Sequence, residues 1–200
     1  SRTSDDTVNF LASHARGLTA VAMWPDRAER LGVPLQRGPA TKAGQSERWL
    51  VTVEARAGVS TGISASDRAA TIQALARPEA RPEDLTTPGH VHPVLADPGG
   101  VVFRSGLAEA AVDLVRAAGL EPIATFCQVL GDDGELLRGD ALDAFAAHHS
   151  LPEVKVAELF THRMASETFV RQLSQATLPT RHGSFLTRAF ENRLDHRQHL

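Results

Sequence analysis

Residues 88–114, PGHVHPVLADPGGVVFRSGLAEAAVDL, place a His-x-His pair, a glycine-containing turn, an arginine and an amphipathic helix in one short run. Val91–Leu95 and Val101–Arg104 are predicted as strands on either side of the turn, and the helix is predicted over Ala108–Ala118. The first backbone N–H groups of a helix are unpaired, and a glycine turn lets an anion approach them closely. The segment therefore predicts an anionic ligand near Arg104, with an ordinary strand-turn-helix corner as the alternative.

Outward from this segment, short apolar runs that predict buried strands alternate with helical patterns. The other predicted strands are Leu18–Trp24, Trp49–Ala55, Ile123–Leu130, the short Lys155–Ala157 and, in the tail, Thr168–Leu173. The other predicted helices are residues 4–16, Asp26–Leu31, the segment after a Ser66 cap, Leu142–His148 and Glu158–Met164. Pro34–Glu47 is predicted as a loop, and hairpin-type turns indicate antiparallel neighbours. These patterns predict a layered α/β domain with a mixed sheet.

Composition narrows the function classes. The hydrophobic fraction of 42% and the formal net charge of -3 exclude a disordered chain and a broad nucleic-acid-binding surface. The single Cys127 excludes an internal disulfide and a cysteine zinc cluster, which favours a reducing cytoplasm. No apolar run approaches the roughly 18 residues that span a bilayer, and no leader is recognised, so we expect a cytoplasmic protein without a membrane partner.

Small hydroxyl residues form a second candidate site. Thr61 and Ser64, on either side of Gly62, are a candidate hydroxyl-lined cradle, unless these side chains only bond neighbouring backbone groups. Glu109 and Asp113 are interpreted as a solvated or capping face of the helix that follows Arg104.

Three segments together resemble a known family. They are VTVEARAGVSTGISASDRAATIQAL (51–75), DLTTPGHVHPVLADPGGVVFRSGLAEAAVDLVRAAGLEPIATFCQVLGDDGELLR (84–138) and FAAHHSLPEVKVAELFTHR (145–163). They closely resemble 3,4-dihydroxy-2-butanone 4-phosphate synthase of riboflavin biosynthesis, over most of residues 4–163. ATLPTRHGSFLTRAF (176–190) resembles the start of a GTP cyclohydrolase II domain, without that domain's cysteine zinc ligands. We therefore expect a synthase-like domain over 1–165 and a tail over 166–200.

The resemblance implies a homodimeric α/β (α+β) fold, a three-layer sandwich with a mixed β-sheet. It also implies a Mg²⁺-dependent reaction that converts ribulose 5-phosphate to 3,4-dihydroxy-2-butanone 4-phosphate and formate. The family's metal ligands are a glutamate in an acidic N-terminal loop and the histidine of an Arg-Gly-Gly-His-Thr motif. Its catalytic glutamate lies in a Cys-Glu pair.

The sequence departs from the family at these positions. The acidic loop has no counterpart, and the arginine motif reads Arg104-Ser105-Gly106-Leu107-Ala108. Gln128 follows Cys127 where the family has its catalytic glutamate, and an amide does not exchange protons near neutral pH. Leucine supplies no metal ligand, so we expect no magnesium site in this chain.

Three functions remain open, as does the question of whether the chain is an enzyme at all. The first is a divergent member with metal-independent chemistry on a sugar phosphate or another small anion. Its predicted catalytic residue is His90, and its predicted substrate-binding residues are Arg104, Ser105, Gly106, Thr61, Ser64 and Gln128. The second is a non-catalytic paralogue that dimerises or supports a flavin-pathway enzyme. The third is the conventional lyase reaction with a different metal site, built on His90 and His92.

Overall fold

The structure is a computed structural model that describes residues 3–36 and 48–200. Most of the predicted loop over Pro34–Glu47 lies outside these described residues. The chain divides into two compact units, Ser1–Val156 and Ala157–Leu200, and each is described by itself.

The first unit is built on a mixed sheet around β1 (Arg16–Met23). β1 runs parallel to β4 (Leu85–Leu95) on one side and antiparallel to β5 (Ile123–Val129) on the other. β2 (Arg48–Trp49) and β3 (Val53–Ala55) both pair antiparallel with β4. The predicted mixed sheet is confirmed.

Side chains on the two faces of β1 enter two different cores. Val21 and Met23 belong to one buried cluster, and Ala20 and Ala22 belong to another. Successive residues of a strand point to opposite faces, so a helix layer must cover each side of the sheet. The alanines leave room for a helix to approach the second face closely.

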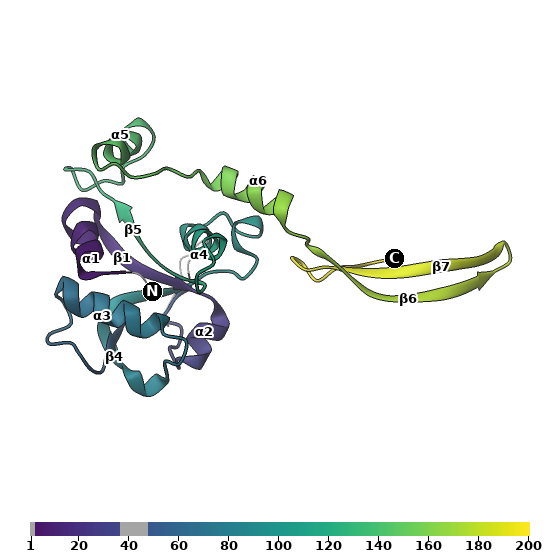
Figure 1. The fold of residues 1–200 in the computed structure, drawn as a ribbon, viewed down its shortest axis with the longest axis horizontal. Coiled ribbons are helices and arrows are strands. Elements are labelled where there is room, and N and C mark those ends of the chain that lie inside the picture. Colours follow the sequence, from purple (N-terminus) through teal and green to yellow (C-terminus); the bar gives the residue numbers. More distant parts are fainter. Residues whose placement is uncertain (1–2, 37–47) are drawn as a thin grey trace. The chain divides into compact units, whose positions relative to one another are not determined.

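Two helical layers provide this cover, and Figure 1 shows β1 running between α3 (Ala65–Ala76) and α4 (Leu107–Ala117). The first face also packs on α1 (Asp5–Phe10) and α2 (Pro25–Arg30), through Val8, Ala28 and Leu31. The second face packs on α4 through Ala108 and Val112. This is the three-layer sandwich that the sequence predicts.

The other regular elements of this unit are short. They are the π-helix Leu11–Ala15, the 3₁₀ turns Pro82–Asp84 and Gly100–Val102, and α5 (Asp140–His148).

Several predicted boundaries are wrong, for local reasons. Val101–Arg104 is no strand, because the Val101 N–H donates to a carboxylate oxygen of Asp113 at 2.8 Å and the backbone turns into a 3₁₀ helix. The single strand predicted over Trp49–Ala55 is divided between β2 and β3. Ser64, and not Ser66, caps α3, since its hydroxyl accepts the Asp67 N–H.

The second unit holds α6 (Val156–Ser166) and a long hairpin of β6 (Val170–Thr180) and β7 (Gly183–Asn192), joined by β8 (Gln198–His199). α6 begins where the sequence predicts the strand Lys155–Ala157, so that strand prediction is wrong. Every residue of β6 is exposed. The domain boundary at 165 and the likeness of the tail to a cyclohydrolase stay predictions.

Within the described ranges, no helix combines the length and the apolar character that a membrane crossing requires.

Candidate functional site

The corner between β4 and α4 holds Arg104 in an ion pair. Its guanidinium donates through Nε to Glu109 Oε1 at 2.9 Å and through Nη2 to the same oxygen. The side chain of Arg104 is 26% exposed and that of Glu109 is 0% exposed. Glu109 Oε1 also accepts the backbone N–H of Asp97 at 2.8 Å.

The acidic residues of α4 thus organise the loop that precedes it. The Glu109 carboxylate accepts hydrogen bonds from the Arg104 side chain and the Asp97 backbone, and the Asp113 carboxylate accepts one from the Val101 backbone. Of the two interpretations of Glu109 and Asp113, a solvated or a capping face, the solvated one is therefore wrong, because both side chains are buried. The carboxylate of Glu109 lies at the N-terminal end of a helix, where negative charge is favourable. In this structure, the negative charge that pairs with Arg104 is the carboxylate of Glu109.

The predicted hydroxyl cradle is largely bonded within itself. One carboxylate oxygen of Asp67 accepts the Ser60 N–H at 3.2 Å, and the other accepts the Ser60 hydroxyl and the Gly62 N–H, both at 2.9 Å. The Ser60 hydroxyl bond is the main cause that lowers the pKa of Asp67. Ser64 caps α3, and Thr61 is exposed. Ser60 and Ser64 thus bond neighbouring groups, and the roles of Thr61 and Ser64 in ligand binding stay predictions.

His90 lies against a carboxylate that sequence reasoning missed. His90 Nδ1 is 3.1 Å from Glu54 Oε2, and the Glu54 side chain is largely buried. Gly62 packs against the same carboxylate, since a Cβ at that position would overlap it. The structure therefore joins His90 to the Thr61–Ser64 loop through Glu54. Glu54 lies in β3, opposite β4, and no local motif in the sequence marks that pairing.

Gln128 and Leu107 line one hollow of about 400 Å³. β5 contributes Gln128, α4 contributes Leu107 at its first position, and the loop before α5 closes the hollow. The remaining lining residues are Cys127, Val129, Leu136, Leu137, Arg138, Gly139 and Leu142. Burial is the main cause that raises the pKa of the Cys127 thiol, so this sulfur stays protonated near neutral pH.

The residues of this hollow do not fit a magnesium ion. Mg²⁺ takes carboxylate and other oxygen ligands in a near-octahedral arrangement. The lining offers leucines, one amide and the cation of Arg138. Among the described residues, no group of three or more His, Cys, Asp or Glu side chains is arranged to hold a metal.

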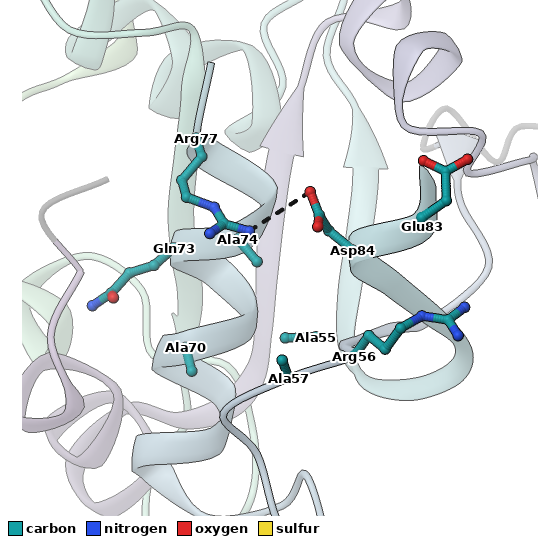
Figure 2. Close-up of a pocket in the computed structure, with 9 residues that line it drawn as sticks. All are labelled: Ala55, Arg56, Ala57, Ala70, Gln73, Ala74, Arg77, Glu83 and Asp84. Atoms are coloured by element: carbon teal, nitrogen blue, oxygen red, sulfur yellow. Dashed lines mark ion pairs between the residues drawn. The ribbon is translucent and has the colours of Figure 1, made fainter. Parts of the chain in front are cut away.

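A second hollow, of about 270 Å³, lies between α3 and the segment after β3. Figure 2 shows Arg77 and Asp84 pointing toward one another across it, with their charged atoms 3.7 Å apart. It contains none of the predicted site residues, and its charges are balanced between two arginines and two acids.

The predicted residues thus fall into three clusters. Arg104 and Gly106 adjoin Glu109, with the exposed Ser105 between them in the chain. The Thr61–Ser64 loop and His90 adjoin Glu54, and Gln128 adjoins the leucine-lined hollow.

Comparison with known proteins identifies relatives over the whole chain. The 3,4-dihydroxy-2-butanone 4-phosphate synthase of Pseudomonas aeruginosa is 41% identical over 201 residues, covering 100% of this chain and 54% of that protein. The riboflavin biosynthesis protein RibBA of Salinispora tropica is 41% identical over 198 residues, covering 98% of this chain and 48% of that protein. The chain spans about half the length of these curated relatives.

Solved structures of this chain's relatives indicate the same family. A two-domain 3,4-dihydroxy-2-butanone 4-phosphate synthase from A. baumannii, RibBX, superposes with a TM-score of 0.82 at 39% identity, covering 94% of this chain and 55% of that one. A synthase solved in complex with two magnesium ions superposes with a TM-score of 0.76 at 31% identity, covering 82% of this chain and 81% of that one. The family model for 3,4-dihydroxy-2-butanone 4-phosphate synthase matches residues 1–162. The chain therefore belongs to the 3,4-dihydroxy-2-butanone 4-phosphate synthase family.

Proposed function

We propose that this chain is a divergent member of its family, which binds a sugar phosphate or another small anion and does not carry out the family's magnesium-dependent reaction. One observation carries this proposal. Leu107 and Gln128, at the positions of the family's metal-binding histidine and catalytic glutamate, line the same hollow. Leucine removes a metal ligand and glutamine removes a proton acceptor from this hollow, so both changes weaken the same magnesium-dependent reaction.

The residues that remain support anion binding and proton transfer. His90, beside Glu54, is the proposed proton-transfer residue, because an adjacent carboxylate holds an imidazole in one orientation. Arg104, Ser105, Gly106, Thr61 and Ser64 are the proposed substrate contacts at the mouth of α4 and in the loop before α3. Gln128 donates or accepts a hydrogen bond without exchanging a proton.

A specific observation favours a second candidate, a non-catalytic paralogue. Arg104 is paired with a completely buried carboxylate, and Asp67 already binds the hydroxyl of Ser60 and the N–H of Gly62. Charged groups that already have ion-pair or hydrogen-bond partners within the protein attract a ligand less strongly than groups without such partners. As a non-catalytic paralogue, the chain would act through dimerisation. For both candidate functions we propose a cytoplasmic homodimer that binds no nucleic acid.

Formate release tests the loss of the family reaction. We expect the protein, incubated with ribulose 5-phosphate and Mg²⁺, to release no formate above the background without protein. Formate release that depends on the protein would contradict the proposal, and would favour the conventional lyase with a different metal site. The double variant Leu107→His/Gln128→Glu is the matched comparison, since it restores the side chains of the family at both positions.

Thermal stabilisation tests ligand binding separately. A ligand that binds only the folded state raises Tm in proportion to ln(1 + [L]/Kd). We expect ribose 5-phosphate to raise Tm, and Arg104→Lys to reduce that rise, because lysine keeps the charge beside Glu109 but loses the planar fork. No rise with any sugar phosphate would favour the non-catalytic paralogue.

A further inference from the structure

The hollow beside Gln128 has an unusual wall of exposed leucines. Leu107 is 49% exposed, and Leu136 and Leu142 are each 38% exposed. They come from three places in the chain: the start of α4, the loop after β5 and the first turns of α5. Single exposed leucines are common on protein surfaces, but leucines gathered around one concavity mark a binding surface.

Size and polarity fit a small molecule. The volume of about 400 Å³ lies within the range of small-molecule sites, which are mostly apolar with a few polar groups that fix orientation. The polar groups here are the amide of Gln128 and the guanidinium of Arg138.

The charged group in the lining of the hollow is a cation. Among its described lining residues, only Arg138 is charged at neutral pH, and it makes no ion pair within the described part of the chain. Of the acids in the loop before it, Asp132 pairs with Arg16 at 2.8 Å, and Asp133 accepts the Glu135 N–H at 3.0 Å. Arg104, in contrast, is offset by Glu109. Arg138 is therefore the cationic group of the lining that an anion in this hollow would meet.

We propose that the hollow binds an anion with an apolar body, whose hydrocarbon packs on Leu107, Leu136 and Leu142 while its charged group meets Arg138. This inference rests on the proposed function and narrows it, because it names the ligand class as amphipathic rather than polar throughout. A polyhydroxylated sugar would leave its hydroxyls unpaired against the leucines, which costs binding free energy.

A series of alkyl phosphates tests the ligand class. Methyl, butyl and hexyl phosphate are titrated into the full chain by calorimetry, with ribose 5-phosphate as the polar comparison. We expect the affinity to rise by about two- to fourfold for each added methylene that is buried. We expect Arg138→Gln to weaken hexyl phosphate by about tenfold. Arg56→Gln is the matched control, since Arg56 lines the other hollow (Figure 2) and its loss should change nothing.

The outcomes separate this inference from the proposed function. If ribose 5-phosphate binds with dependence on Arg104 but chain length has no effect, the inference is wrong and the proposed function stands. If no phosphate binds, both fail. If Leu142→Ser changes the mass measured by light scattering instead of hexyl phosphate binding, a second copy of the chain covers the leucines and the inference is overturned. Length dependence that is lost in Leu142→Ser and reduced in Arg138→Gln supports it.

Discussion

The carboxylate of Glu109 determines how the corner before α4 is built. It receives hydrogen bonds from the side chain of Arg104 and the backbone of Asp97, and it is completely buried. Removing one partner of a buried ion pair is costly, because the other charge stays in a poorly solvated place. Glu109 therefore acts on the site through Arg104, as a positioning residue.

We expect Glu109→Ala to lower the free energy of unfolding by about 3 kcal/mol, and Glu109→Gln by less, because the amide oxygen still accepts one of the hydrogen bonds. Urea denaturation measures both. Arg77→Gln is a suitable control, since its pair with Asp84 is partly exposed and 3.7 Å long, and exposed pairs contribute about 0 to 1 kcal/mol. Equal losses in Glu109→Ala and Arg77→Gln would contradict this account.

Sequence reasoning located part of the site at the level of residues. It places Arg104 at the mouth of a helix and assigns Leu107 and Gln128 to two positions of the family's site, since motif spacing and family resemblance carry that information. It missed Glu54 as the partner of His90, because that contact forms only when β3 pairs with β4. It also misjudged Glu109, because an acidic residue in the first turn of a helix has the same sequence pattern whether it is solvated or buried.

Among the elements, the end of α5 packs its rings on the π-helix Leu11–Ala15. The ring of His149 lies 4.8 Å from that of His14 and 4.5 Å from that of Phe145, between centroids. Burial is the main cause that lowers the pKa of His149, and the charges of His14 and His148 lower it further. The folded state therefore disfavours protonation of this imidazole.

This lowered pKa predicts the pH dependence of stability. Below the ordinary pKa of about 6.5, the unfolded chain binds a proton at His149 that the folded state does not. Stability is thus fully present above that pH and is lost as the pH falls toward the lowered, folded-state pKa. Urea denaturation from pH 7.5 to 5 should show this fall.

His149→Phe should make the dependence shallower, because phenylalanine keeps the ring but does not titrate. Some dependence should remain, since burial also lowers the pKa of His92 in β4. A profile that His149→Phe leaves unchanged would show that this ring cluster does not control the pH dependence.

The pairing of β3 with β4 depends on a residue without a side chain. A Cβ on Gly89 would overlap the backbone of Val53 and Glu54, and a backbone cannot rotate away as a side chain can. We expect Gly89→Ala to lower the free energy of unfolding by about 2 kcal/mol and to weaken the contact of Glu54 with His90. Gly58→Ala is the control: nothing lies within 4 Å of its Cβ, so only the backbone penalty of its φ of +78° applies.

Thermal or urea denaturation measures both glycine variants, and the His90 imidazole resonances report the local contact. Equal losses of stability in the two variants would contradict a steric role for Gly89.

Elements with strong periodicity were predictable, and those set by tertiary bonds were not. α4 and β1 follow their apolar patterns closely. Burial of one helix face, or of both strand faces, requires apolar residues at a regular spacing, and that spacing is visible in the sequence. The turn at Gly100–Val102 has the composition of a strand but follows the carboxylate of Asp113. That carboxylate lies a dozen residues away in the chain, beyond the range of local patterns.

At the scale of the molecule, the two units differ in how much they bury. Ser1–Val156 contains two buried clusters on opposite faces of its sheet, whereas β6 is exposed along its whole length. A small sheet in which a whole strand buries no residue is only marginally stable in water. The two units should therefore open independently.

Hydrogen exchange followed by mass spectrometry measures this difference. We expect the amides of β6 and β7 to exchange orders of magnitude faster than those of β1 and β4, because local opening costs little free energy where few apolar groups are buried. Equal protection in the hairpin and the central sheet would indicate that a partner or a further segment covers β6 in solution.

The buried acids of α4 also affect how the ligand specificity of this site can change by substitution. Glu109 and Asp113 fix the preceding loop from the inner side of the helix, while Leu107 faces the hollow at the first position of that helix. The framework and the ligand-facing surface are thus encoded by different side chains. A substitution at residue 107 can alter what is bound without disturbing the loop, so this helix can acquire new specificities one residue at a time.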